Sequence, residues 1–118
     1  MEFGEAISTC WSKSTTFTGR ARRPEYWYWF LFNFIATLVL GFIQFVISDI
    51  GGQILQVLFD LAVLLPSIAV TTRRLHDTDR SGWWQLLFLL PIIGWILLIV
   101  WLSQAGTPGP NRFGPDPA

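Results

Sequence analysis

The sequence predicts an all-α integral membrane protein, with three transmembrane helices and a short N-terminal amphipathic surface helix. Hydrophobic residues make up 52% of the 118 residues and charged residues only 14%, against roughly 25% charged in ordinary soluble domains. Three segments of about 20 residues, the length that a bilayer core requires, hold a single charge between them. A chain of this length forms one domain, residues 1–118, and three such helices would leave a soluble domain no polar surface.

Residues 2–16 are predicted to form the surface helix. Its apolar residues fall at helical spacing on one side: Phe3, Ile7, Cys10 and Trp11. Such a helix can lie on the membrane with Trp11 at the headgroup level, and a frayed terminus is the alternative. Its first residues are acidic and no apolar run follows at once, so a signal peptide is not expected.

The first predicted span covers about residues 26–47. A basic cluster precedes it: Arg20, Arg22 and Arg23. Pro24 and Glu25 suit a helix start, because proline tolerates the first turn and glutamate meets the positive end of the helix dipole. The aromatic run at residues 26–29 is typical of the water–lipid boundary.

The second predicted span, about residues 54–72, follows the short connection SDIGGQ, so the two helices should pack antiparallel. Polar and small residues recur on both at three- or four-residue steps: Asn33, Thr37, Gly41, Gln44, Gln53, Gln56, Asp60, Ser67 and Thr71. These stripes favour contact between the helices, since such residues line helix interfaces in membranes. Asp60 and Gln44 are close in depth, so we expect them to pair. A polar pathway for a solute is the alternative.

The third predicted span covers about residues 84–102. Trp84 and Trp101 lie about 26 Å apart in a continuous helix and would mark its two interfaces. Pro91 and Gly94 predict a kink near its middle, and a reversal of the chain there is the alternative. Residues 106–118 contain four prolines and three glycines, so we expect an extended, turn-rich tail.

The loop RRLHDTDRSGWW concentrates charge between the second and third spans. A catalytic site would use His76 as a general base beside Asp77 and Asp79, and a metal site would use the same three residues as ligands. Neither is favoured, because the sequence has no nucleophile in a recognisable motif, no second histidine and no pair of cysteines. We therefore expect no catalytic residue, no metal and no cofactor. Asp77 and Ser81 can instead cap the start of a helix.

Three segments together resemble a known family: GRARRPEYWYWFLFN, RRLHDTDRSGWW and GTPGPNRFGPDP. In order and spacing they are similar to domain of unknown function 805, a family of small bacterial inner-membrane proteins. The opening MEFGEAISTCW also resembles the start of many members. The resemblance implies a protein of the bacterial inner (plasma) membrane with no established activity, and it provides no catalytic residues.

The distribution of basic residues predicts the orientation in the membrane. Seven of the eight Lys and Arg residues fall on one side of a three-span arrangement, and SDIGGQ has none. Short loops rich in Lys and Arg stay cytoplasmic. The N-terminus and the loop at residues 73–80 are therefore expected in the cytoplasm, and the tail outside.

Two classes of function remain. The leading hypothesis is a non-enzymatic membrane protein whose cytoplasmic basic face binds lipid headgroups, a protein partner or a further copy of the chain. The residues expected in this role are Arg20, Arg22, Arg23, Arg73, Arg74, His76, Asp77 and Arg80. The alternative is a small oligomeric transporter or channel component that uses the intramembrane residues Asn33, Gln44 and Asp60. No phosphate-binding loop or nucleic-acid module occurs, so nucleic acid is not expected as a partner.

Overall fold

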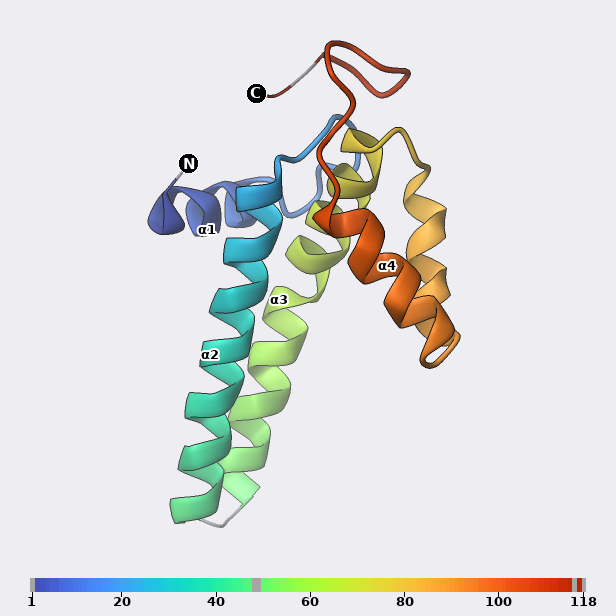
Figure 1. Ribbon diagram of the computed structural model, residues 1–118. Coiled ribbons are helices and arrows are strands. Elements are labelled where there is room, and N and C mark those ends of the chain that lie inside the picture. Colours follow the sequence, from blue (N-terminus) through green and yellow to red (C-terminus); the bar gives the residue numbers. More distant parts are fainter. Residues whose placement is uncertain (1, 48–49, 116, 118) are drawn as a thin grey trace.

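The protein is built from helices, as predicted. The computed structural model describes residues 2–47, 50–115 and 117, and this part of the chain holds five helices and no β-strand. They are α1 (Phe3–Ser12), α2 (Arg23–Ile47), α3 (Ile50–Asp77), the 3₁₀ helix η1 (Gly82–Leu89) and α4 (Ile93–Ser103). α2 and α3 form a long antiparallel pair, α1 lies across the start of α2, and η1 with α4 forms a shorter hairpin beside α3 (Figure 1).

The α2–α3 pair is long and apolar enough to cross a membrane. The two helices have 25 and 28 residues, about 37 and 42 Å of helix, against a hydrocarbon core of about 30 Å. Trp29 Nε1 donates to Ser67 Oγ at 3.0 Å across their contact. Their outer surface is covered by large apolar side chains, and Phe45 is 85% exposed. An apolar surface of this extent fits a lipid environment better than water.

The predicted N-terminal helix is present but shorter, over Phe3–Ser12 instead of residues 2–16. Its small buried residues, Ala6 and Cys10, allow α1 to approach α2 closely. The rings of Trp11 and Trp29 meet edge to face with centroids 5.3 Å apart. The apolar face of α1 is therefore used at least partly against α2, in addition to any contact with lipid.

The prediction of a continuous third span over residues 84–102 is wrong. The chain forms η1, turns at Pro91 and Ile92, and returns as α4, so the two arms lie side by side (Figure 1). Trp84 and Trp101, expected about 26 Å apart along one helix, instead meet edge to face with ring centroids 5.6 Å apart. α4 has 11 residues, about 16 Å, and is too short to cross a core of about 30 Å.

The reversal is a γ-turn centred on Ile92. Its φ is 70° and its ψ is −70°, and Ile93 N donates to Pro91 O at 2.9 Å. This left-handed conformation costs about 1–3 kcal/mol in a β-branched residue, so surrounding contacts must hold it. The close approach of Gly94 to η1 is one of them, because a Cβ there would overlap the carbonyl oxygen of Leu87.

The reversal also determines where the tail lies. Thr107 N donates to Asp77 O at 2.7 Å, and Arg20 Nη1 donates to Gly109 O at 2.7 Å. The tail therefore lies at the same end of the α2–α3 pair as the segment that precedes α2 (Figure 1). The prediction that the membrane separates the tail from the basic loops is wrong, because these segments are in direct contact.

The predicted pairing of Asp60 with Gln44 is also wrong. Gln56 Nε2, one turn earlier on α3, donates to Asp60 Oδ1 at 2.9 Å, and Asp60 is exposed. Gln44 Nε2 instead donates to Gly52 O at 3.1 Å. Asp60 lies on the flank of the helix pair, because its neighbour Phe59 occupies the position whose ring packs on α2.

Candidate functional site

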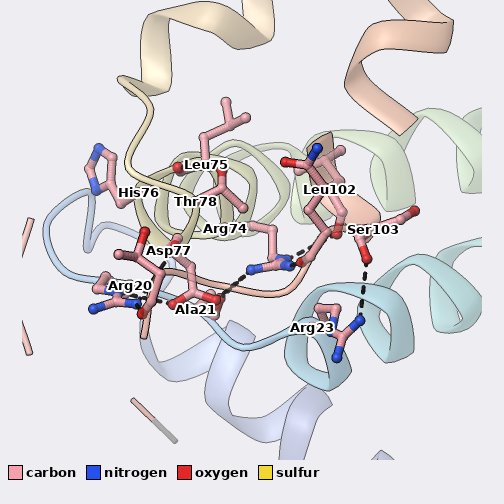
Figure 2. Close-up of polar contacts among 12 residues, drawn as sticks. Arg20, Ala21, Arg23, Arg74, Leu75, His76, Asp77, Thr78, Leu102 and Ser103 are labelled. Atoms are coloured by element: carbon pink, nitrogen blue, oxygen red, sulfur yellow. Dashed lines mark hydrogen bonds and ion pairs between the residues drawn. The ribbon is translucent and has the colours of Figure 1, made fainter. Parts of the chain in front are cut away.

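Charged side chains gather where α2 begins and α3 ends. At their centre is Asp77, the last residue of α3, whose carboxylate meets two guanidinium groups (Figure 2). Arg20 Nε lies 2.9 Å from Asp77 Oδ1, and Arg74 Nη1 lies 2.6 Å from Oδ2. The three side chains, here termed the arginine–aspartate cluster, are at most 6% exposed. Solvent ions therefore screen their attraction only weakly.

The two arginines of the cluster also donate hydrogen bonds to backbone carbonyl oxygens. These oxygens lie in the last turn of α4 and in the segment that follows it. Because two positive charges face one carboxylate, carbonyl dipoles offset the excess. Four of the acceptors are the carbonyl oxygens of Thr107 (2.6 Å) and Gly109 (2.7 Å) for Arg20, and of Leu102 (3.0 Å) and Gln104 for Arg74. The cluster thus joins segments up to 94 positions apart in the sequence, since Arg20 Nη1 also donates to Gly114 O at 3.3 Å.

The tail is fitted closely to the end of α3. Gly106 passes directly over Asp77, where a Cβ would overlap the carboxylate. Beyond it, Asn111 Nδ2 donates to His76 O at 2.9 Å, and the ring of Phe113 stacks on His76 with centroids 4.0 Å apart. Residues 106–113 of the tail are therefore packed against this end of the molecule.

A second buried ion pair lies beside the cluster. Arg73 Nη1 pairs with Glu25 Oε1, and both side chains are at most 5% exposed. Within the described residues, Arg73 Nε and Nη2 have no hydrogen-bond partner, so Glu25 is the main compensation for this buried charge. Cys10 Sγ lies 3.8 Å from Glu25 O. Burial, and next the negative charge of Glu25, raise the pKa of the Cys10 thiol to about 12.

The residues of the unfavoured catalytic or metal site point in different directions. His76 Nδ1 lies 2.8 Å from Gly19 O, Asp77 faces the two arginines, and Asp79 pairs with Arg112 at 3.2 Å on the surface. Within the described part of the chain, no group of three His, Cys, Asp or Glu residues is placed to hold a metal ion. The side chains of these three residues therefore do not converge on one point.

Two arginines at the start of α2 make few contacts of this kind. Among the described residues, the Arg22 side chain has neither a hydrogen bond nor an ion pair, and Arg23 donates a 3.4 Å bond to Ser103 O (Figure 2). Both line a recess of about 570 Å³ between α2 and the tail, together with the rings of Trp27 and Tyr28. We term this the basic recess.

The structure divides the eight residues predicted to interact with lipids or partners into two groups. Five are buried in internal contacts: Arg20, Arg73, Arg74, His76 and Asp77. The accessible three are Arg22, Arg23 and Arg80. Arg80 is partly engaged, since its guanidinium lies 4.5 Å over the ring of Trp101 and donates to Gln104 Oε1 at 3.0 Å.

The reciprocal pairing of the two basic motifs was not predicted from the sequence. Asp77 was expected as a helix cap, and Glu25 as a dipole-stabilising residue. In the structure, each motif supplies one carboxylate to an arginine of the other: Arg20 meets Asp77, and Arg73 meets Glu25. The one available signal was that each basic motif contains an acidic residue. The cap predicted at Ser81 is confirmed, because its side chain accepts from Trp83 N at 3.3 Å.

Comparison with known proteins identifies relatives over most of the chain. Residues 14–115 match the family described as "Protein of unknown function (DUF805)". The chain is 57% identical over 104 residues to "Inner membrane protein YhaH" of Escherichia coli (strain K12), covering 86% of each chain. It is 48% identical over 101 residues to "Inner membrane protein YhaI" of the same strain, covering 86% of this chain and 85% of the relative. No solved structure matches it.

Proposed function

The chain belongs to the family of proteins of unknown function DUF805, and we propose that, like the relatives named inner membrane proteins, it resides in the bacterial inner membrane. α2 and α3 would cross the membrane as a hairpin. The η1–α4 hairpin would enter from the same side as the termini and return, because its arms are apolar but too short to cross.

Charge supports an orientation with both ends of the chain in the cytoplasm. All eight Lys and Arg residues lie between the end of α1 and the start of α2, at the end of α3 and in the loop after it, or in the tail, and these segments share one end of the molecule (Figure 1). The connection between α2 and α3 has no Lys or Arg. Such asymmetry is typical of a cytoplasmic basic end.

We further propose a non-enzymatic function in which the basic recess binds the headgroup of an anionic phospholipid. The observation that carries this proposal is the position of Arg22 and Arg23, which line the recess without a carboxylate partner among the described residues. Asp77 also lines it, but Arg20 and Arg74 already offset its charge. Guanidinium groups bind phosphate oxygens in pairs, and the aromatic rings of the recess suit the depth of lipid headgroups.

Native mass spectrometry of the detergent-purified protein tests the proposal. The double variant Arg22→Gln/Arg23→Gln should retain phosphatidylglycerol about 30-fold less well, at about 1 kcal/mol per arginine, and phosphatidylcholine equally. Arg112→Gln is the matched control, since this arginine is 61% exposed and lies outside the recess. Equal retention by the double variant and the control would refute the site. Displacement of the lipid by millimolar inorganic phosphate would indicate a site for a free anion instead.

The transporter alternative has weaker support from the geometry. Transport past Asp60 would require a water-filled cavity at that residue, and Asp60 instead lies on the outer flank of the α2–α3 pair. A pathway at this position would have to lie between copies of the chain.

A further inference from the structure

The α2–α3 pair has two flanking grooves of opposite character. One is lined by apolar side chains alone, among them Phe32, Val39 and Phe59. The other contains a recess of about 210 Å³ that is lined by aromatic rings of α2 and by three polar side chains of α2 and α3. The polar side chains are Asn33, Ser67 and Thr71.

The polar groove continues toward the middle of the helix pair. Thr37 follows Asn33 by four residues on α2, and Asp60 precedes Ser67 by seven on α3, so each lies on the same helix face as its polar neighbour. Thr37 and Asp60 are both exposed. Gln56 extends the face by a further turn and donates to Asp60. We term Asn33, Thr37, Gln56 and Asp60 the polar flank.

Asp60 lies too deep for lipid headgroups to reach if α3 spans the membrane. Ten residues, about 15 Å of helix, separate it from Ile50, where α3 begins, and twelve residues separate it from Thr72 near the other end. Ionisable side chains at such depth are costly unless a polar group meets them, and they characteristically face other helices. In this chain, the hydrogen bond from Gln56 occupies one carboxylate oxygen, Oδ1.

We infer that two copies of the chain associate through the polar flank. The inference rests on the proposed membrane-spanning role of α2 and α3. Copies inserted in the same orientation carry identical groups at identical depth, so a two-fold axis along the membrane normal leaves Asp60 of both copies at one depth. Thr37 lies close to this depth, because Trp29 meets Ser67 and Gln44 meets Gly52 across the antiparallel pair, and Gln56 lies one helical turn, about 6 Å, away. Amide and hydroxyl donors then face a carboxylate acceptor in both directions, which makes the surface self-complementary. The apolar groove is left to lipid chains.

Disulfide cross-linking in isolated native membranes tests the inference. In a Cys10→Ser background, Thr37→Cys should form a dimer of twice the monomer mass on mild oxidation. Val39→Cys is the matched control, because it lies two residues away in the apolar groove and is 53% exposed. Adding Asp60→Leu should lower cross-linking at Thr37→Cys by about three- to tenfold, and Asp60→Asn should preserve it, because the amide still hydrogen-bonds.

Three outcomes would overturn the inference. Equal cross-linking at the two positions would indicate random collision, and an unchanged yield with Asp60→Leu would remove the polar flank from the contact. A product of another mass would identify a different protein as the occupant. Extraction of the membranes at alkaline pH shows separately whether the protein is membrane-integral, since only a non-integral protein would be released. A protein that stays in the membrane but does not cross-link would contradict the dimer alone.

Discussion

Replacing Asp77 by asparagine should destabilise the protein more than any surface charge change. The substitution keeps the shape of the side chain and removes the negative charge that lies within 2.9 Å of Arg20 and 2.6 Å of Arg74. Removing one partner of a buried ion pair costs about 3–5 kcal/mol, because the remaining charge is buried without compensation. We expect a loss within that range instead of twice it, since backbone carbonyl oxygens continue to accept from both arginines, Thr107 O from Arg20 and Leu102 O from Arg74.

Unfolding of the purified protein in mixed micelles, followed by fluorescence of its seven tryptophans, measures this loss. Asp79→Asn is the matched control two residues away. Its partner Arg112 is 61% exposed and Asp79 itself is 48% exposed, so that variant should lose less than about 1 kcal/mol. Proteolysis should also cleave the tail of Asp77→Asn faster than that of the control, because the tail binds the cluster.

Equal stability of the two variants would refute the reasoning, because it would show that the buried cluster contributes no more than an exposed pair. A double-mutant cycle with Arg74→Met adds a second criterion. The double variant should be less destabilised than the sum of the two single variants, since Asp77→Asn no longer leaves Arg74 unpaired. Simple additivity would mean that the two residues do not interact.

Three further predictions concern the hairpin, the tail and the buried thiol. Gly94→Ala should cost about 1–3 kcal/mol in unfolding free energy, because its Cβ would overlap η1, whereas Gly41→Ala, with open space around it, should not destabilise; equal losses would contradict the turn. In a Cys10→Ser background, cysteines placed at Thr107 and Thr78 should both resist an impermeant thiol reagent in intact cells, and labelling of the first alone would contradict the shared side. In the folded wild-type protein, a pKa of about 12 instead of 9.0 lowers the thiolate fraction of Cys10 at pH 8 about a thousandfold. Maleimide labelling should therefore require denaturation, and rapid labelling of folded protein would show that this environment is wrong.

Local patterns in the sequence were enough to predict the helical class, α1 and the antiparallel α2–α3 pair. Helix length, apolar periodicity and the shortness of the connection at residues 48–53 are properties of neighbouring residues. The same local information failed at the third segment, because Pro91 and Gly94 are compatible with both a kink and a reversal. Contacts between η1 and α4 stabilise the reversal, among them the packing of Trp84 on Trp101.

The sequence by itself determined that most Lys and Arg residues lie on one side of the helices, and the tertiary structure decided which of these charges remain available. Arginine pairs equally well with a lipid phosphate or with an aspartate, so composition and spacing could not distinguish the two uses. Arg20 is buried because Asp77, 57 residues away, and the returning tail surround it, whereas Arg22, two residues later, has no such partner among the described residues. Proximity of distant segments, which only the folded chain creates, therefore separates the arginines that hold the structure together from those that are free to bind.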